Sequence, residues 1–96
     1  MNQTAAAMRV HVRLTGRVQG VGYRFFASET ARGLSLSGWV RNLPDGDVEC
    51  EVQGSEKEIE KFLKELKSGH PWAQVDHLLS EKVPEKSSEP GFEIQI

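Results

Sequence analysis

Ninety-six residues are enough for one domain with a modest hydrophobic core, and 38% of them are hydrophobic. No apolar stretch approaches the ~20 residues that cross a bilayer, and the single cysteine, Cys50, excludes an internal disulfide and a cysteine-rich zinc site. Residues 1–7 lack the features of a secretory signal. We therefore expect a disordered tail over 1–7, one domain over 8–96, and a cytoplasmic, monomeric protein.

The formal net charge of −2 conceals two halves of opposite sign. Residues 1–42 hold six arginines and one acid, whereas residues 43–96 hold six lysines and thirteen acids. Arginine suits bidentate binding of anions, and lysine on an exposed helix mainly solvates that helix. An alternative of similar weight is that most of these arginines face outward from strands. Arg24 is the exception, because it ends a glycine-rich stretch over residues 16–24.

The first half of the chain predicts a strand, a helix and a second strand. Residues 8–15 alternate apolar and polar side chains, the pattern of a strand with one buried face. Residues 23–32 fit a helix with an apolar face that includes Phe26, and Gly33 is its expected stop. Residues 36–42 have the pattern of the second strand.

A turn, a third strand and a second helix come next. Residues 44–46 read Pro-Asp-Gly, a turn sequence, and residues 47–53 alternate as a strand antiparallel to the preceding one. Ser55 with Glu58 three residues later forms a capping box, the signature of a helix start. Apolar residues recur at helical spacing over 59–66, which predicts an amphipathic helix.

The last part of the chain predicts one more long strand over 75–83, a polar connection over 84–91 and a short final strand over 92–96. The element order is therefore βαββαβ plus a terminal strand. Two amphipathic helices on one face of a mainly antiparallel sheet bury their apolar stripes. We predict the α+β class with a ferredoxin-like α/β sandwich, a fold that hosts many functions and identifies none.

RNA-recognition domains share this element order, and they stack bases on aromatic side chains of the first and third strands. Neither 8–15 nor 47–53 contains an aromatic residue. The sequence therefore predicts no nucleic-acid partner.

A glycine-rich stretch joins the first strand to the first helix. Residues 16–24 read Gly-Arg-Val-Gln-Gly-Val-Gly-Tyr-Arg. Glycines allow a tight bend that turns backbone N–H groups toward one point, and such an array ahead of a helix suits an oxyanion or a phosphate. Arg24 adds a planar charged fork that matches phosphate geometry. The predicted phosphate-binding loop is Gln19, Gly20, Val21, Gly22 and Tyr23.

Simple nucleotide-binding motifs do not fit this loop. A Walker A motif needs a lysine, and the first lysine of the chain is Lys57. A dinucleotide-binding fingerprint would need Gly or Ala where Phe25 stands. A glycine-rich turn without any ligand is the alternative interpretation.

A second stretch, Gly38-Trp39-Val40-Arg41-Asn42, precedes the turn at 43–46. Asn42 ends a predicted strand, where its amide can donate and accept hydrogen bonds toward a neighbouring site. The alternative is that Asn42 only caps the turn. Trp39 is expected to pack against its neighbours rather than to bind a ligand.

The two stretches together resemble the acylphosphatase family, whose pattern is Gly-x-Val-Gln-Gly-Val-x-Tyr/Phe-Arg followed by Gly-Trp-Val-x-Asn-x-x-Asp-Gly-x-Val. The matching residues are Gly16, Val18, Gln19, Gly20, Val21, Tyr23 and Arg24, then Gly38, Trp39, Val40, Asn42, Asp45, Gly46 and Val48. Neither motif departs from the pattern, and the resemblance covers residues 8–96.

This resemblance implies a hydrolase that converts a small-molecule acyl phosphate to a carboxylate and orthophosphate, with no cofactor and no metal. It implies that loop N–H groups and Arg24 hold the phosphoryl group and that Asn42 orients the attacking water. The chemistry is consistent, because a carboxylate whose conjugate acid has a pKa near ~4 leaves without a general acid. A non-catalytic anion-binding or regulatory domain of the same fold is the alternative function.

Several other residues are expected to be structural. Cys50 occupies an apolar strand position, which predicts a buried, inert thiol. His11 alternates outward on the first strand, and His70 and His77 are seven residues apart across Pro71, a poor spacing for metal ligands, so they are expected to be structural or exposed. Trp72 is expected to cover the end of the core.

Overall fold

The computed structural model describes residues 7–96, so the predicted tail lies outside the described residues except for Ala7. Ala7 is already part of the first strand, one residue before the predicted start. In chain order the elements are β1 (Ala7–Arg17), α1 (Tyr23–Gly33), β2 (Ser37–Asn42), β3 (Val48–Ser55), α2 (Glu56–Ser68), β4 (Gln74–Val83) and β5 (Phe92–Ile94). No helix in this part of the chain is long and apolar enough to cross a membrane.

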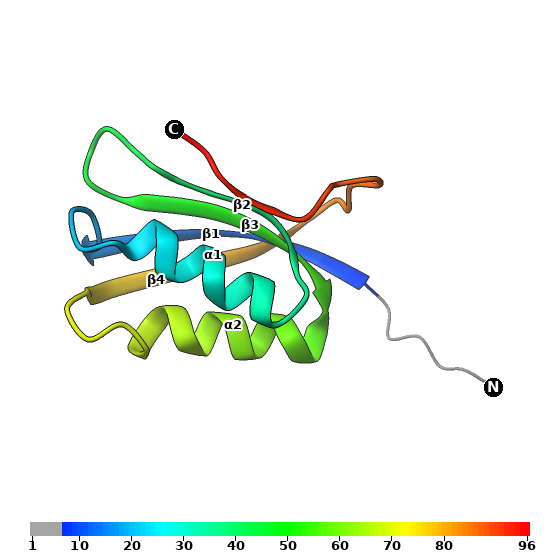
Figure 1. The fold of residues 1–96 in the computed structure, drawn as a ribbon, viewed down its shortest axis with the longest axis horizontal. Coiled ribbons are helices and arrows are strands. Elements are labelled where there is room, and N and C mark those ends of the chain that lie inside the picture. Colours follow the sequence, from blue (N-terminus) through cyan, green and yellow to red (C-terminus); the bar gives the residue numbers. More distant parts are fainter. Residues whose placement is uncertain (1–6) are drawn as a thin grey trace.

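The strands form one sheet in the order β4-β1-β3-β2-β5. β1 pairs antiparallel with both β3 and β4, β2 pairs antiparallel with β3, and the short β5 runs parallel to β2. Figure 1 shows α1 and α2 side by side against one face of this sheet. The arrangement confirms the predicted α+β, ferredoxin-like sandwich with a mainly antiparallel sheet.

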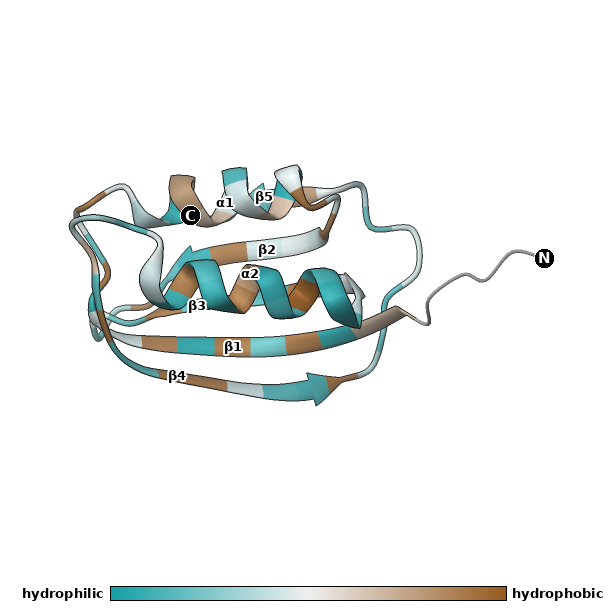
Figure 2. Cartoon of the chain, turned by 90° about the horizontal axis from the view of Figure 1, so that it is seen from below, coloured by the Kyte–Doolittle hydropathy of each residue, from teal (hydrophilic) through white to brown (hydrophobic). Residues whose placement is uncertain are grey.

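The core lies between the helices and the sheet because alternate strand residues point toward the helices. Figure 2 shows this alternation as brown and teal bands along β1. The buried hydrophobic side chains that the strands contribute are Val10, Val12, Leu14, Val40, Val48, Cys50, Val52 and Phe92. Cys50 is completely buried, as predicted, and this burial raises the pKa of its thiol well above the ordinary value. A protonated thiol in this position is a poor nucleophile.

Helix α2 begins as its local sequence predicts. Ser55 is the N-cap, and its Oγ accepts a hydrogen bond from the backbone N–H of Glu58 at 3.3 Å. Glu56 and Glu58 lie in the first turn, where negative charge interacts favourably with the helix dipole. The buried residues Ile59 and Phe62 belong to the predicted apolar stripe.

Helix α1 ends later than predicted. Gly33 is its last residue rather than the residue that stops it, and the left-handed conformation is taken by Ser35, with φ 58°. The backbone N–H of Leu36 donates to the carbonyl oxygen of Ala31 at 2.9 Å, and the Leu36 side chain is buried. Burial of Leu36 therefore draws the chain back into the core directly after the helix.

Most arginines of the strands are partly or fully exposed, in agreement with the alternative that they face outward, and Arg9 on the outer face of the sheet is the exception. Arg9 is fully buried, at 0% exposed. Its guanidinium donates to Glu51 at 2.7 Å, to Gln53 at 3.1 Å, and to both carboxylate oxygens of Glu89 at 2.8 and 3.1 Å. Glu89 belongs to the connection 84–91, which thereby covers this part of the sheet.

The rest of the outer face carries paired charges. His11 lies there as predicted, with its Nε2 2.7 Å from a carboxylate oxygen of Glu49, and Arg41 donates to the same carboxylate at 2.8 Å. The Arg41 guanidinium also lies 5.1 Å from the ring centroid of Trp39. Trp39 is therefore a packing residue of this face, as expected.

Trp72 does not cover the end of the core, because its side chain is 73% exposed. Instead, His70 packs there, with ring centroids 5.9 Å from Tyr23 and 5.1 Å from Phe26. The His70 Nδ1 accepts the backbone N–H groups of Trp72 and Ala73 at 3.1 and 3.2 Å. These bonds fix the bend after α2, so that His70 takes the place expected for Trp72.

Candidate active site

The glycine loop between β1 and α1 adopts an alternating backbone. Gly20 and Gly22 have φ of 79° and 75°, and Val21 between them has an ordinary negative φ. A non-glycine residue rarely adopts the left-handed conformation, so the two glycines are needed here for their backbone freedom. Alternation of hand turns successive N–H groups to one side, which is the geometry of an anion-binding nest. Within residues 7–96, no N–H group of residues 19–22 donates to another residue.

The N-terminus of α1 is open, in contrast with that of α2. Its N-cap, Gly22, has no side chain that could accept a hydrogen bond, and the first turn holds no acid. The first N–H groups of any helix lack partners within the helix and carry part of its positive dipole. The loop and the helix start therefore present a row of unused donors to whatever lies in front of them.

Asn42 lies near the glycine loop at the end of another strand. It is the last residue of β2, and the turn after it is closed by the Leu43 N–H, which donates to the carbonyl oxygen of Asp47 at 2.8 Å. The Gln19 side chain donates through Nε2 to both of those residues, to the carbonyl oxygens of Leu43 and Asp47 at 2.8 Å each. Gln19 thus connects the glycine loop to the turn that directly follows Asn42.

A pocket of about 240 Å³ lies between these segments. It is lined by Val18, Gln19, Gly20, Gly22, Tyr23, Arg24, Phe25, Asn42 and Ile94. Six of the seven predicted site residues are in this set. Val21 is not, because its half-buried side chain packs against the core. The volume is below the ~300–1,000 Å³ typical of sites for drug-sized ligands, and therefore suits a small molecule.

Two polar side chains in the pocket have unused hydrogen-bonding capacity. Arg24 makes a single hydrogen bond within the described chain, from Nη1 to the carbonyl oxygen of Gln95 at 3.3 Å. The Oδ1 of Asn42 is buried, and no residue among 7–96 donates to it. A buried polar atom without a partner costs roughly 1–3 kcal/mol, and such cases in native proteins usually mark a bound water or ligand. The pocket is therefore arranged to receive an anion and a polar group that donates to Asn42.

Tyr23 contributes to the pocket through its position rather than its hydroxyl. The side chain is 1% exposed, and its hydroxyl donates to the carbonyl oxygen of Leu66 at 2.5 Å. Burial raises the pKa of this phenol well above its ordinary value. Tyr23 therefore anchors the start of α1 to the end of α2, and its hydroxyl is not available to the pocket.

Three lining residues were not predicted from the sequence: Val18, Phe25 and Ile94. Val18 is buried beneath the loop. Phe25 did leave a sequence signal, because it is a large aromatic residue that lies off the apolar stripe of its helix. Ile94 left none, since its neighbours in space are far from it in sequence.

The comparisons with known proteins bear on the same segments. The family model described as Acylphosphatase matches residues 10–94. The chain belongs to the acylphosphatase family. The acylphosphatase of Bifidobacterium longum is 43% identical over 84 residues, which cover 88% of this chain and 87% of that protein. The match confirms the resemblance drawn from the two motifs and, with it, the predicted hydrolase activity on acyl phosphates.

Solved acylphosphatase structures have the same architecture. The acylphosphatase of Bacillus subtilis superposes with a TM-score of 0.88 at 31% identity, covering 93% of this chain and 99% of that one. An acylphosphatase from Coxiella burnetii superposes with a TM-score of 0.87 at 34% identity, covering 99% of this chain and 100% of that one. The family fold therefore extends over nearly the whole described chain.

Proposed function

We propose that acyl phosphate hydrolysis takes place in the pocket between the glycine loop and Asn42. The phosphoryl oxygens bind the guanidinium of Arg24 and the backbone N–H groups of the loop residues Gln19, Gly20, Val21, Gly22 and Tyr23. The observation that carries this proposal is the pairing of unused donors with an unpartnered acceptor, Oδ1 of Asn42, in one pocket. Donors suit the phosphate, and the acceptor suits a water.

Phosphoryl transfer requires that charge on the equatorial oxygens be stabilised and that the nucleophile lie in line with the leaving group. Fixed N–H donors and a guanidinium meet the first requirement without reorganisation during the reaction. Oδ1 of Asn42 accepts a hydrogen bond from the attacking water and so directs a lone pair of the water oxygen toward phosphorus. The carboxylate then departs unprotonated, because its conjugate acid has a pKa near ~4.

No lining residue provides a general base. Carboxylates and imidazoles are missing from the lining residues of the described chain, and the Tyr23 hydroxyl is committed to Leu66. We therefore assign the water proton to a phosphoryl oxygen: the bond from the water oxygen to phosphorus forms, the bond from phosphorus to the acyl oxygen breaks, and orthophosphate carries the proton away. Neither a metal ion nor a cofactor is needed in this scheme.

The surface of the sheet bears on the partners of the protein. The outer faces of β1 and β3 carry ion pairs such as Arg9 with Glu51, and these groups suit nucleic acid poorly. We propose a monomer in the cytoplasm that acts on a small-molecule acyl phosphate without a nucleic-acid partner.

The test compares benzoyl phosphate hydrolysis by the wild type, Arg24→Ala and Arg32→Ala. Arg32 lies on the same helix and also donates to a backbone carbonyl of the C-terminal segment, that of Phe92 at 3.1 Å. We expect activity in the wild type and in Arg32→Ala, competitive inhibition by inorganic phosphate, and no effect of EDTA. Arg24→Ala should lose both turnover and phosphate inhibition. Phosphate binding without any turnover in the wild type would instead support the non-catalytic, anion-binding alternative.

A further inference from the structure

Two apolar side chains at the pocket are left without a role by the proposed mechanism. Phe25 is 64% exposed, and Ile94 is 40% exposed. Both line the pocket, Phe25 from the first turn of α1 and Ile94 from the end of β5. A phenyl ring that is exposed at a pocket has apolar surface that a ligand can bury.

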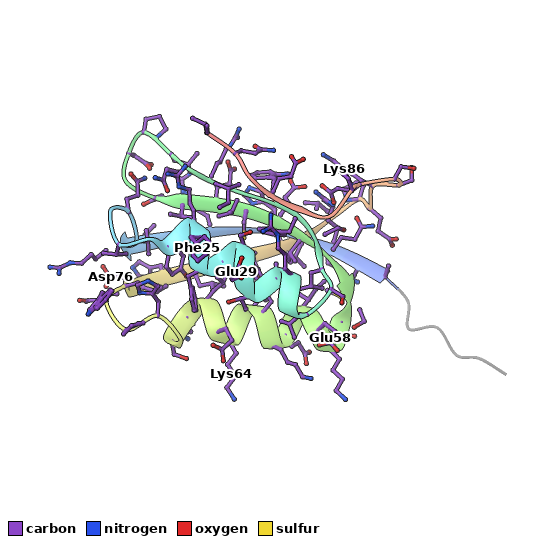
Figure 3. All side chains as sticks on the ribbon, in the orientation of Figure 1. Phe25, Glu29, Glu58, Lys64, Asp76 and Lys86 are labelled. Atoms are coloured by element: carbon purple, nitrogen blue, oxygen red, sulfur yellow. The ribbon has the colours of Figure 1, made fainter. Side chains whose placement is uncertain are left out.

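Packing within the protein does not explain Phe25. Its neighbours Tyr23 and Phe26 pack against each other and against His70, with ring centroids 5.1–5.9 Å apart. Phe25 belongs to none of the aromatic contacts found in the described chain. Figure 3 shows it on the outward side of α1, at the same side of the helix as Glu29. The ring therefore contributes to the rim of the pocket and not to the core.

Polarity is unevenly distributed around the pocket. The donors come from the glycine loop and Arg24, and Arg24 is the only charged side chain among the lining residues of the described chain. Phe25 and Ile94 carry no polar side-chain atom. A molecule that fits both parts has one anionic end and one apolar end. An acyl phosphate has this form when its acyl group is a hydrocarbon.

We propose that Phe25 and Ile94 form the subsite for the acyl group and that they favour acyl phosphates with a bulky apolar or aromatic acyl group over acetyl phosphate. The inference rests on the proposed function, because it requires the phosphoryl group to lie at the loop. Phe25 and Arg24 line the same pocket, so an acyl group attached to a phosphate held by Arg24 lies in the space that Phe25 borders. An aromatic acyl group attached to that phosphate can contact the ring, whereas the single methyl group of acetyl phosphate has little surface to contribute.

The experiment measures kcat/KM for benzoyl phosphate and acetyl phosphate in the wild type, Phe25→Ala and Ile94→Ala. The matched control is Leu79→Ala, because Leu79 is 65% exposed but lies on β4 beside a different hollow, formed with His11 and Arg13. Each variant is compared with the wild type on the same substrate, so that differences in intrinsic reactivity cancel. We expect Phe25→Ala to lower kcat/KM roughly tenfold for benzoyl phosphate and less than twofold for acetyl phosphate. Ile94→Ala should show the same preference, with a smaller decrease in kcat/KM for benzoyl phosphate.

A binding measurement separates recognition from chemistry. Phenylphosphonate and inorganic phosphate are compared as competitive inhibitors, and Phe25→Ala should weaken the first roughly tenfold and the second less than twofold. Phe25→Leu keeps an apolar side chain and should lie between the wild type and Phe25→Ala in both assays. Equal losses on the two substrates, or losses no larger than those of Leu79→Ala, would refute the acyl subsite alone. A wild type that hydrolyses neither substrate would refute the proposed function itself.

Discussion

Arg9 and Arg24 are two arginines of one small chain in opposite situations. Arg9 is fully buried, and its guanidinium is surrounded by acceptors from Glu51, Gln53 and Glu89. Arg24 has one long hydrogen bond, of 3.3 Å, and borders a pocket. An arginine whose donors are mostly used by the protein stabilises the fold, whereas one whose donors are mostly free can bind an anion. The number of unused donors, rather than charge alone, distinguishes the two roles.

The strongest way to test this comparison is to remove each arginine in turn. Arg24→Ala should lower kcat/KM by at least ~10³-fold, as expected for loss of an arginine that stabilises a phosphoryl transition state, with little change in thermal stability. Arg9→Ala should lower the free energy of unfolding by about 2–4 kcal/mol, because it leaves two carboxylates facing one another. Kinetic assays and urea unfolding give kcat/KM and the free energy of unfolding for each of the two variants. Parallel effects of the two substitutions would contradict the division of roles.

Asn42 sharpens the comparison, because its unpartnered oxygen belongs to a residue that lines the same pocket as Arg24. Asn42→Ala should lower kcat by about 10²–10³-fold, the loss expected on removing one oriented polar group from a transition state. KM should change little, since the phosphoryl group is held by other groups. Steady-state kinetics with benzoyl phosphate measures both constants. A variant impaired only in KM would contradict the assignment of Asn42 to the water.

Gln19, which links the glycine loop to the turn after Asn42, is expected to affect the rate less than Arg24 or Asn42. Gln19→Ala removes two hydrogen bonds of 2.8 Å and should lower the free energy of unfolding by about 1–2 kcal/mol and kcat by roughly tenfold. Gln74→Ala is the control, since Gln74 is exposed and its side chain bonds only to Asp76 within the described chain. Unfolding and kinetics are measured in parallel. An intact kcat in Gln19→Ala would show that the loop holds its position without this link.

The smallest expected effect concerns pH on the Arg9 side. The hydrogen bonds from Arg9 lower the pKa of Glu89, with burial acting in the opposite direction. A lowered pKa means that this carboxylate stabilises the fold above its unfolded value of ~4.3, and that the stabilisation is lost as the pH falls through the lower folded value. Glu89→Gln should therefore cost about 1 kcal/mol at pH 7, and the difference from the wild type should shrink below about pH 4.

Urea unfolding of the wild type, Glu89→Gln and the exposed control Glu93→Gln at pH 7, 5 and 3.5 tests this dependence. Glu93→Gln should differ from the wild type by less than ~0.5 kcal/mol throughout. A difference for Glu89→Gln that stays constant over the three pH values would show that its ionisation does not stabilise the fold.

Local rules in the sequence predicted local structure well. The cap at Ser55 and the turn at Gly46 depend on residues within a few positions, and the structure contains both, with Gly46 at φ 100°. The loop residues and Asn42 were found because two motifs could be read together. The structure brings all of them except Val21 to the lining of one pocket, although their individual roles in catalysis stay predictions.

The features that the sequence missed or mispredicted depend on distant partners. Arg9 is buried because Glu51 and Glu89, 42 and 80 residues away, supply its acceptors. Alternation along one strand cannot show what covers the outer face of that strand. Trp72 was mispredicted for a similar reason. The hydrophobicity of a residue in a bend does not show which way its side chain points, and in this bend His70, not Trp72, packs against Tyr23 and Phe26.

The pocket draws on residues from Val18 to Ile94, and this span has a consequence for synthesis of the protein. A growing chain that has reached residue 70 contains the glycine loop, Arg24 and Asn42, yet it lacks β4 and β5. The sheet order places β1, the strand that leads into the loop, between β3 and β4, so the early segments lack a neighbour until late in translation. Nascent fragments of this length should therefore bind no phosphate, and the ability to bind it should arise in a single step once β5 has left the ribosome.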